Sequence, residues 1–121
     1  MRLELLGEEL ALCRLGGGED VPGWARGELL ATVRTAAELS LVCAAEAVPA
    51  DVRSDGGWRA LRVAGTLELT LTGVLAELLT PLAAAEVPIF AVSSYDTDYV
   101  LVPGGRLEEA VEALAAAGHE L

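Results

Sequence analysis

The sequence contains no lysine, because all eight of its basic residues are arginines. A chain without lysine cannot supply a P-loop lysine, a Schiff base or a lysine general base. Histidine is scarce as well: His119 is the only one, and it is the third residue from the end of the sequence. The end of a chain is a poor place for a catalytic base. These two shortages argue against an enzyme.

Recognisable catalytic and metal-binding patterns are also missing. The sequence has no G-x-S-x-G, no H-E-x-x-H and no phosphate-cradling glycine loop. The run Gly16–Gly18 is followed by Glu19 and Asp20, which would repel a phosphate, so we expect a flexible loop there. Cys13 and Cys43 lie in apolar, strand-like runs without metal-type spacing, which favours buried free thiols over a disulfide. We expect no catalytic residues, no cofactor and no metal.

The sequence also has few positively charged residues and no long apolar run. Acidic residues outnumber basic ones by 19 to 8, for a net charge of −11. Nucleic acids and anionic membranes bind to clusters of arginine and lysine, so both are poor partners for this acidic chain. No apolar run reaches the roughly 18 to 20 residues that span a bilayer, and Glu4, Glu8 and Glu9 are unlike a secretory signal. We expect a soluble cytoplasmic protein.

The chain does have enough hydrophobic residues, 53% of 121, for one ordinary domain or two very small ones that share a core. Its first half is strand-like. Apolar runs at 3–6 and 10–15 flank a turn and predict a hairpin, and the runs at 28–34 and 39–45 predict two further strands. Thr35 and Glu38 have the spacing of a capping box, which predicts a very short helix between these two strands. Residues 49–57 are the best linker candidate.

The second half is more regular. Residues 58–65 alternate as a half-buried strand does, and residues 88–93 and 98–102 predict two strands that pair antiparallel across a tight turn. A helix is predicted from Gly73, capped by Thr72 and kinked at Pro81. Its buried face consists of Leu75, Leu78, Leu79 and Leu82.

A second helix is expected after Gly105, with Gly118 as its stop and residues 119–121 as a short final strand. The resulting β-α-β-β-α order is the ferredoxin-like split βαβ motif. The first half repeats this order in a reduced form. We therefore predict an α+β fold of two tandem ferredoxin-like units, residues 1–56 and 57–121, with antiparallel sheets and helices on one face.

Asp96 and Asp98 follow two serines and come directly before an apolar strand, in the stretch SSYDTDYVLV. The simplest interpretation is that these aspartates satisfy a β-turn by accepting hydrogen bonds from nearby backbone N–H groups. A Ca²⁺ or Mg²⁺ site would need further acids at a matching spacing. An aspartic dyad would need two carboxylates that share a proton.

The segments GWRALRVAGTLELTLTGVLAELLTPLAAAEVPIFAVSSYDTDYVLV and TVRTAAELSLVC resemble the small tandem ACT-domain proteins of bacteria. These are relatives of the ACT pairs in aspartate kinase regulatory regions and in the Castor arginine sensors. The resemblance extends from Leu3 to Gly118. It implies a βαββαβ regulatory fold that binds an amino acid between two ACT units packed side by side, usually as a homodimer.

The resemblance also implies a binding site. In ACT domains the loop from the first strand into the first helix contributes, which corresponds to residues 70–75 here, with Thr72, Gly73, Val74 and Leu75 as the expected binding residues. In the Castor relatives a serine and an aspartate near the strand turn contact the ligand, and they match Ser93 and Asp98; Ser94 and Asp96 are their neighbours. A helix N-terminus offers free N–H groups to an α-carboxylate. The aspartates would suit a cationic side chain or the α-amino group equally well.

The leading hypothesis is therefore a non-enzymatic amino-acid sensor that acts on a separate partner enzyme. The alternative hypothesis is a scaffold or regulatory subunit that binds a partner protein through its ACT surface and has a vestigial ligand pocket. A response to free amino acids would distinguish the two.

Overall fold

The computed structural model describes all residues from 1 to 121 and divides into two compact units. Unit 2 is the continuous stretch Gly7–Trp58, and unit 1 combines Met1–Leu6 with Arg59–Leu121. The secondary structure elements in chain order are β1 (Leu3–Leu5), β2 (Leu10–Gly16), β3 (Ala31–Arg34), β4 (Glu38–Ala44), the 3-10 helix η1 (Ala45–Ala47), β5 (Ser54–Val63), α1 (Val74–Ala84), β6 (Phe90–Ser93), β7 (Asp98–Pro103), the 3-10 helix η2 (Gly104–Arg106) and α2 (Leu107–Ala116).

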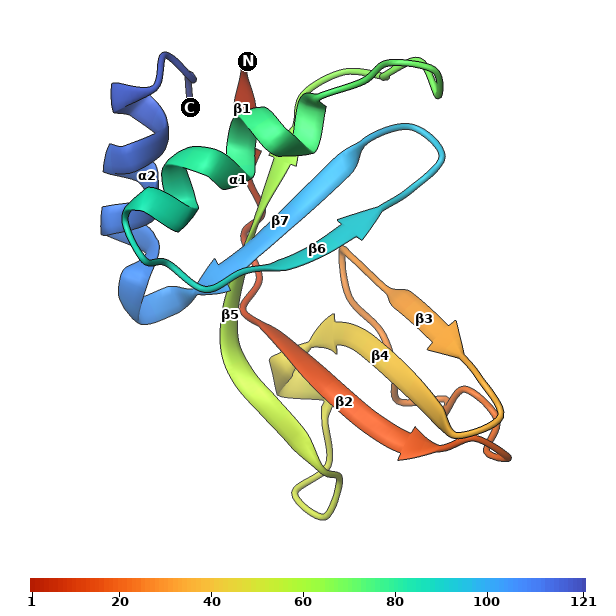
Figure 1. The fold of residues 1–121 in the computed structure, drawn as a ribbon. Coiled ribbons are helices and arrows are strands. Elements are labelled where there is room, and N and C mark those ends of the chain that lie inside the picture. The colour runs from red at the N-terminus through yellow and green to blue at the C-terminus, as the bar shows by residue number, and fades with distance from the viewer. The chain divides into compact units, whose positions relative to one another are not determined.

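Unit 2 is built from antiparallel strands (Figure 1). The strand β4 pairs with β3 on one side and with β2 on the other, and β2 also pairs with the first part of β5, with an irregularity between Leu10 and Leu12. The unit contains the short 3-10 helix η1 and no α-helix. The β5 strand begins at Ser54, so the linker expected at 49–57 is wrong in its second half.

The predicted short helix at Thr35–Glu38 is also wrong, because residues 35–37 form the turn between β3 and β4, and Glu38 is the first residue of β4. The Thr35 Oγ1 atom accepts hydrogen bonds from the backbone N–H groups of Ala37 and Glu38, both at 3.2 Å. The Thr35 N–H donates to the carbonyl of Glu38 at 2.9 Å. A threonine hydroxyl can cap a tight turn as well as a helix, and the pairing of β3 with β4 decided between the two.

The core of unit 2 contains both cysteines. Cys13 and Cys43 are buried and free, as expected from the sequence, and pack with Ala11, Leu39 and Leu41. The register pairs Cys13 with Leu41 and Ala11 with Cys43, so the two thiols are diagonal neighbours on one face. Burial, followed by the contact with Cys43, raises the pKa of the Cys13 thiol to about 12.

Unit 1 contains an antiparallel sheet that includes the N-terminal strand. Leu3 of β1 pairs with Val63 of β5, β7 neighbours β5, and β6 pairs with β7 from Phe90↔Leu101 to Ser93↔Asp98. The predicted hairpin between residues 3–6 and 10–15 is therefore wrong, since β1 pairs with β5 instead of β2.

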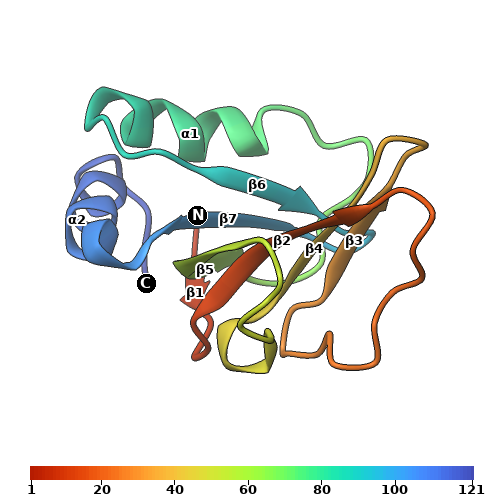
Figure 2. The same cartoon turned by 90° about the horizontal axis from the view of Figure 1, so that it is seen from below.

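The final residues join the same sheet. Glu120 forms a parallel bridge with Arg2, and the Leu3 N–H donates to the Glu120 carbonyl at 2.6 Å. The two chain ends consequently lie close together (Figures 1 and 2). The expected final strand at 119–121 is present in this minimal form.

The core of unit 1 lies between its sheet and its two helices, which contact each other (Figure 1). Leu78 and Leu82 of α1 are at most 2% exposed, and α2 contributes Ala110 and Leu114. These side chains pack on Leu61, Val63, Val100 and Val102 of β5 and β7. The leucine spacing of the first predicted helix is thus explained by burial on one sheet face. None of the helices has both the length and the apolar character needed to cross a membrane.

The helix α1 begins differently from the prediction. Gly73 is its N-cap residue, with a left-handed φ of 82°, and no side chain caps the helix, so Thr72 does not serve as a cap. The helix continues through Pro81 to Ala84. The N–H group that proline lacks leaves the Glu77 carbonyl without a helical partner. His119 contacts that carbonyl with Nε2 at 3.2 Å.

Candidate functional site

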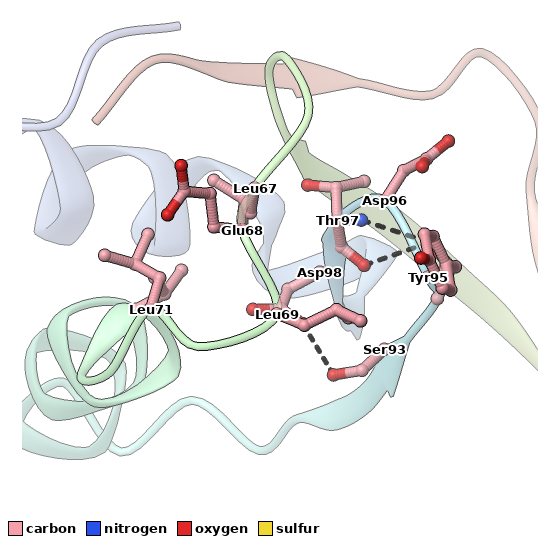
Figure 3. A pocket seen from close by; sticks show the side chains of 11 residues that line it. Leu67, Glu68, Leu69, Leu71, Ser93, Tyr95, Asp96, Thr97 and Asp98 are labelled. Carbon is pink, nitrogen blue, oxygen red and sulfur yellow. Dashed lines mark hydrogen bonds between the residues drawn. The ribbon is translucent and has the colours of Figure 1, made fainter.

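A cavity of about 220 Å³ in unit 1 separates the loop that leads into α1 from the turn between β6 and β7 (Figure 3). Its volume is below the roughly 300 to 1,000 Å³ of clefts that hold drug-sized ligands, which suits a small molecule. The loop contributes three leucines and an acid, and the turn contributes hydroxyls and two acids. The lining residues are Leu67, Glu68, Leu69, Leu71, Val74, Ser93, Ser94, Tyr95, Asp96, Thr97 and Asp98.

The turn is stabilised mainly by its serine and threonine groups. The Ser94 Oγ atom accepts a hydrogen bond from the Thr97 N–H at 3.2 Å and donates to the Thr97 carbonyl at 3.1 Å. The Ser94 N–H donates to the same carbonyl at 2.9 Å. The Ser93 hydroxyl donates to Asp98 Oδ1 at 2.6 Å. Ser93 and Asp98 are also paired in the strand ladder, so backbone and side chains hold them together.

The two aspartates differ in their surroundings. Asp98 is half-buried and bonded to Ser93, whereas Asp96 is exposed and its carboxylate makes no hydrogen bond. Figure 3 shows the Asp96 carboxylate pointing away from the Asp98 carboxylate. This geometry does not bring the two acids together to share a proton. No group of three or more His, Cys, Asp or Glu side chains is placed to hold a metal ion.

The cavity is lined by acidic residues and by exposed apolar residues. Glu68, Asp96 and Asp98 are its only charged lining residues, so the cavity favours a cationic group. The leucines of the loop give the cavity an apolar part as well: Leu69 is 68% exposed and Leu71 is 56% exposed. Apolar surface therefore adjoins the acidic groups of the cavity.

The N-terminus of α1 lies next to the cavity through Val74. The N–H groups of the first helical turn have no partners within a helix, and no side chain caps them. A Cβ atom placed on Gly73 would meet no atom within 4 Å, so the backbone there is open to approach. The left-handed φ of Gly73 would strain any larger residue. A Gly73 substitution would therefore confound strain with blocked access.

The sequence hypothesis and the cavity overlap in part. Of the residues expected to bind a ligand, Val74, Ser93, Ser94, Asp96 and Asp98 line this cavity. Thr72, Gly73 and Leu75 do not line it: the first two are exposed next to Val74, and Leu75 packs against the core of unit 1.

Sequence reasoning missed most of one wall of the cavity. Leu67, Glu68 and Leu69 lie between the strand expected at 58–65 and the loop expected at 70–75, and Leu71 belongs to that loop but was not among the expected binding residues. In the structure the strand ends at Val63 and this stretch is a loop. Thr97, which is 5% exposed, was also missed. Gly65, with a φ of 85°, was the available signal for the end of the strand.

Comparisons with known proteins agree with this organisation. A model of the ACT domain matches residues 53–116, and a second family model, for an N-terminal domain, matches residues 8–51. The ACT match includes the loop, the turn and α1, and therefore the whole cavity.

Solved structures resemble the chain over nearly its full length. A protein from Agrobacterium tumefaciens is 36% identical with a TM-score of 0.93, and the alignment covers 99% of this chain and 90% of that one. A Vibrio cholerae protein described as a possible transport protein is 23% identical, with a TM-score of 0.78 and coverages of 96% and 88%.

A third similar structure is the regulatory subunit of aspartate kinase from Thermus flavus. It is 14% identical with a TM-score of 0.65, and the alignment covers 95% of each chain. This likeness concerns the fold, and it matches the α+β arrangement of antiparallel sheet and two helices. An ACT domain of this kind indicates a regulatory role instead of a catalytic one. With more than half of its length matched by the family model, the chain belongs to the ACT-domain family.

Proposed function

We propose that this protein is a non-enzymatic regulatory sensor that binds an amino acid at the cavity between the loop 64–73 and the turn 94–97. The observation that carries the proposal is the cavity of about 220 Å³ within the region matched by the ACT model, with Asp96 and Asp98 on its turn side and the α1 N-terminus next to its loop side. An amino acid carries both charges that these two features attract.

The Asp98 carboxylate is the best candidate to hold the ligand's ammonium. It is already oriented by the Ser93 hydroxyl at 2.6 Å, and one of its oxygens is committed to that bond while the other is not. The free N–H groups at the start of α1 would receive the ligand's carboxylate, because the helix dipole favours an anion there. Asp96 and Glu68 would add electrostatic attraction without direct contact.

We also propose that the sensor works as a homodimer and acts on a separate partner enzyme. The strand β6 is unpaired on one side and has no charged residue, which leaves its backbone free to pair with a second copy. Its last residue, Ser93, lines the cavity, so pairing along β6 would place a second copy next to the ligand. We further infer that unit 2 is a divergent ACT-like unit, in line with the separate family model that matches it.

A thermal-shift screen with each of the twenty amino acids tests the proposal. A ligand at a hundred times its dissociation constant stabilises the fold by about 2.7 kcal/mol, which corresponds to several degrees for a domain of this size. In Asp98→Asn the affinity for the amino acid identified should fall about tenfold or more, since a charge-assisted hydrogen bond contributes roughly 1.5 to 3 kcal/mol. Calorimetric titration measures the loss.

Two variants serve as controls for this test. Asp51→Asn removes one charge from an exposed turn in unit 2 and should leave affinity unchanged. Asp96→Asn should weaken binding less than Asp98→Asn, because its carboxylate points away from that of Asp98 (Figure 3). Equal affinities for wild type and Asp98→Asn would contradict the assigned role.

A second candidate function is a scaffold or regulatory subunit that binds a partner protein through the same face. The exposed side chains of Leu69, Leu71 and Tyr95 favour it, since an apolar patch of this kind suits a protein surface. In that case none of the twenty amino acids would shift the melting temperature at millimolar concentration.

A further inference from the structure

Thr97 is a buried polar residue in a turn that is otherwise exposed. Its side chain is 5% exposed, while Tyr95 and Asp96 beside it are exposed. The Thr97 hydroxyl donates a hydrogen bond to the carbonyl of Val63 at 2.7 Å. Val63 is the last residue of β5, the point at which the chain turns into the loop that forms the other wall of the cavity.

A second hydrogen bond links the same two segments. The Leu67 N–H donates to the Asp96 carbonyl at 2.7 Å. The turn is thus attached to the loop at two points, Val63 and Leu67, four residues apart. Between them the chain passes through Gly65, whose φ of 85° allows the reversal. The hairpin ladder of β6 and β7 itself contains neither bond.

We propose that Thr97 is a positioning residue, whose hydroxyl fixes the separation between the acidic turn and the loop that leads to α1. This inference rests on the proposed function, since that separation matters for binding only if the two segments hold opposite ends of one ligand. The strand ladder keeps β6 and β7 together without Thr97, but it does not set how far the turn stands from the loop. Loss of the hydroxyl should therefore loosen the site before it loosens the sheet.

Hydrogen exchange on the ligand-free protein tests this inference directly. Thr97→Val preserves the shape of the side chain and removes the hydroxyl, whereas Thr97→Ser retains the hydroxyl. In Thr97→Val the amide of Leu67 should exchange about tenfold faster than in wild type, while the amides of Val100 and Leu101 in β7 keep their protection. In Thr97→Ser the Leu67 amide should exchange nearly as slowly as in wild type.

A matched control separates local loosening from general loss of stability. Thr35→Val removes a turn hydroxyl in unit 2 that accepts two backbone hydrogen bonds, and it should leave the exchange of the Leu67 amide unchanged. If Thr97→Val does not fold, Thr97→Ala replaces it. If neither variant folds, or if Val100 and Leu101 lose protection together with Leu67, Thr97 has a global structural role and the proposal is overturned.

The binding consequence is measured with the amino acid that gives the largest thermal shift with wild type. Its affinity should fall at least tenfold in Thr97→Val and recover in Thr97→Ser. An unchanged affinity despite faster Leu67 exchange would overturn the positioning role. If none of the twenty amino acids binds wild type, the proposed function fails, while the exchange data still decide whether Thr97 joins turn and loop.

Discussion

His119 makes a hydrogen bond in place of the one that Pro81 removes from α1, and the contribution of this bond to the free energy of unfolding can be measured. Proline at position 81 has no N–H, so the Glu77 carbonyl one turn earlier lacks its helical partner. The His119 Nε2–H donates to that carbonyl at 3.2 Å, and the ring is 8% exposed. A carbonyl accepts and does not donate, so the proton must lie on Nε2.

The expected change in the free energy of unfolding depends on which hydrogen-bonding groups each variant leaves without a partner. His119→Ala removes the ring's packing and its contact with the Met1 amino group, and it also deprives the Glu77 carbonyl of a hydrogen bond that contributes about 1 kcal/mol. Pro81→Ala restores an N–H that can bond to Glu77. In that background His119→Ala should lose its packing and its contact with the Met1 amino group, which lies 2.9 Å from Nδ1, but no longer the bond to Glu77, so the two changes should be coupled by about 1 kcal/mol or more.

Urea denaturation of wild type, both single variants and the double variant measures this coupling. A control cycle pairs Pro81→Ala with Val48→Ala, whose side chain packs on the core of unit 2, and should be additive. If His119→Ala costs the same free energy with proline and with alanine at position 81, the bond to the Glu77 carbonyl adds nothing to stability and our explanation of the continuous helix is refuted.

Two further predictions concern assembly and pH. The uncharged, unpaired edge of β6 should support a two-fold dimer, and an Ala91→Pro change on that strand should shift light scattering towards monomer; a wild-type monomer at micromolar concentration would refute the dimer. Because the Cys13 thiol has its pKa raised from 9.0 to about 12, the unfolded chain loses that proton first, and the free energy of unfolding should fall as pH rises from about 9 towards 12. Cys13→Ala should reduce this fall, and equal pH slopes for the two proteins would contradict the shift.

Local sequence patterns predicted unit 1 well where the interactions are local. The hairpin of β6 and β7 has a four-residue turn, so its strands find each other without any distant contact. The leucines of α1 repeat at helical spacing, which requires only one buried face. Five of the residues expected to bind a ligand line the cavity because they belong to these two local elements.

The errors occur where distant segments compete for the same strand edge. Residues 3–6 and 10–15 have the pattern of a hairpin, yet β1 pairs with β5, almost sixty residues away, and β2 pairs with β4. Similarly, Thr35 and Glu38 satisfy the spacing of a helix cap, but the ladder of β3 and β4 uses the same hydroxyl to close a turn. Patterns of neighbouring residues do not record which distant backbone is available for pairing.

The sequence by itself determined the composition limits, the second-half order of strands and helices and the ACT resemblance, because lysine content, periodicity and turn residues are properties of short stretches. Only the tertiary structure decided that Met1–Leu6 belongs with Arg59–Leu121, that Thr97 bonds to Val63, and that His119 serves the carbonyl that Pro81 leaves free. Each of these depends on a hydrogen-bonding group whose partner lies tens of residues away. Such partners become neighbours only when apolar burial has folded the chain around them.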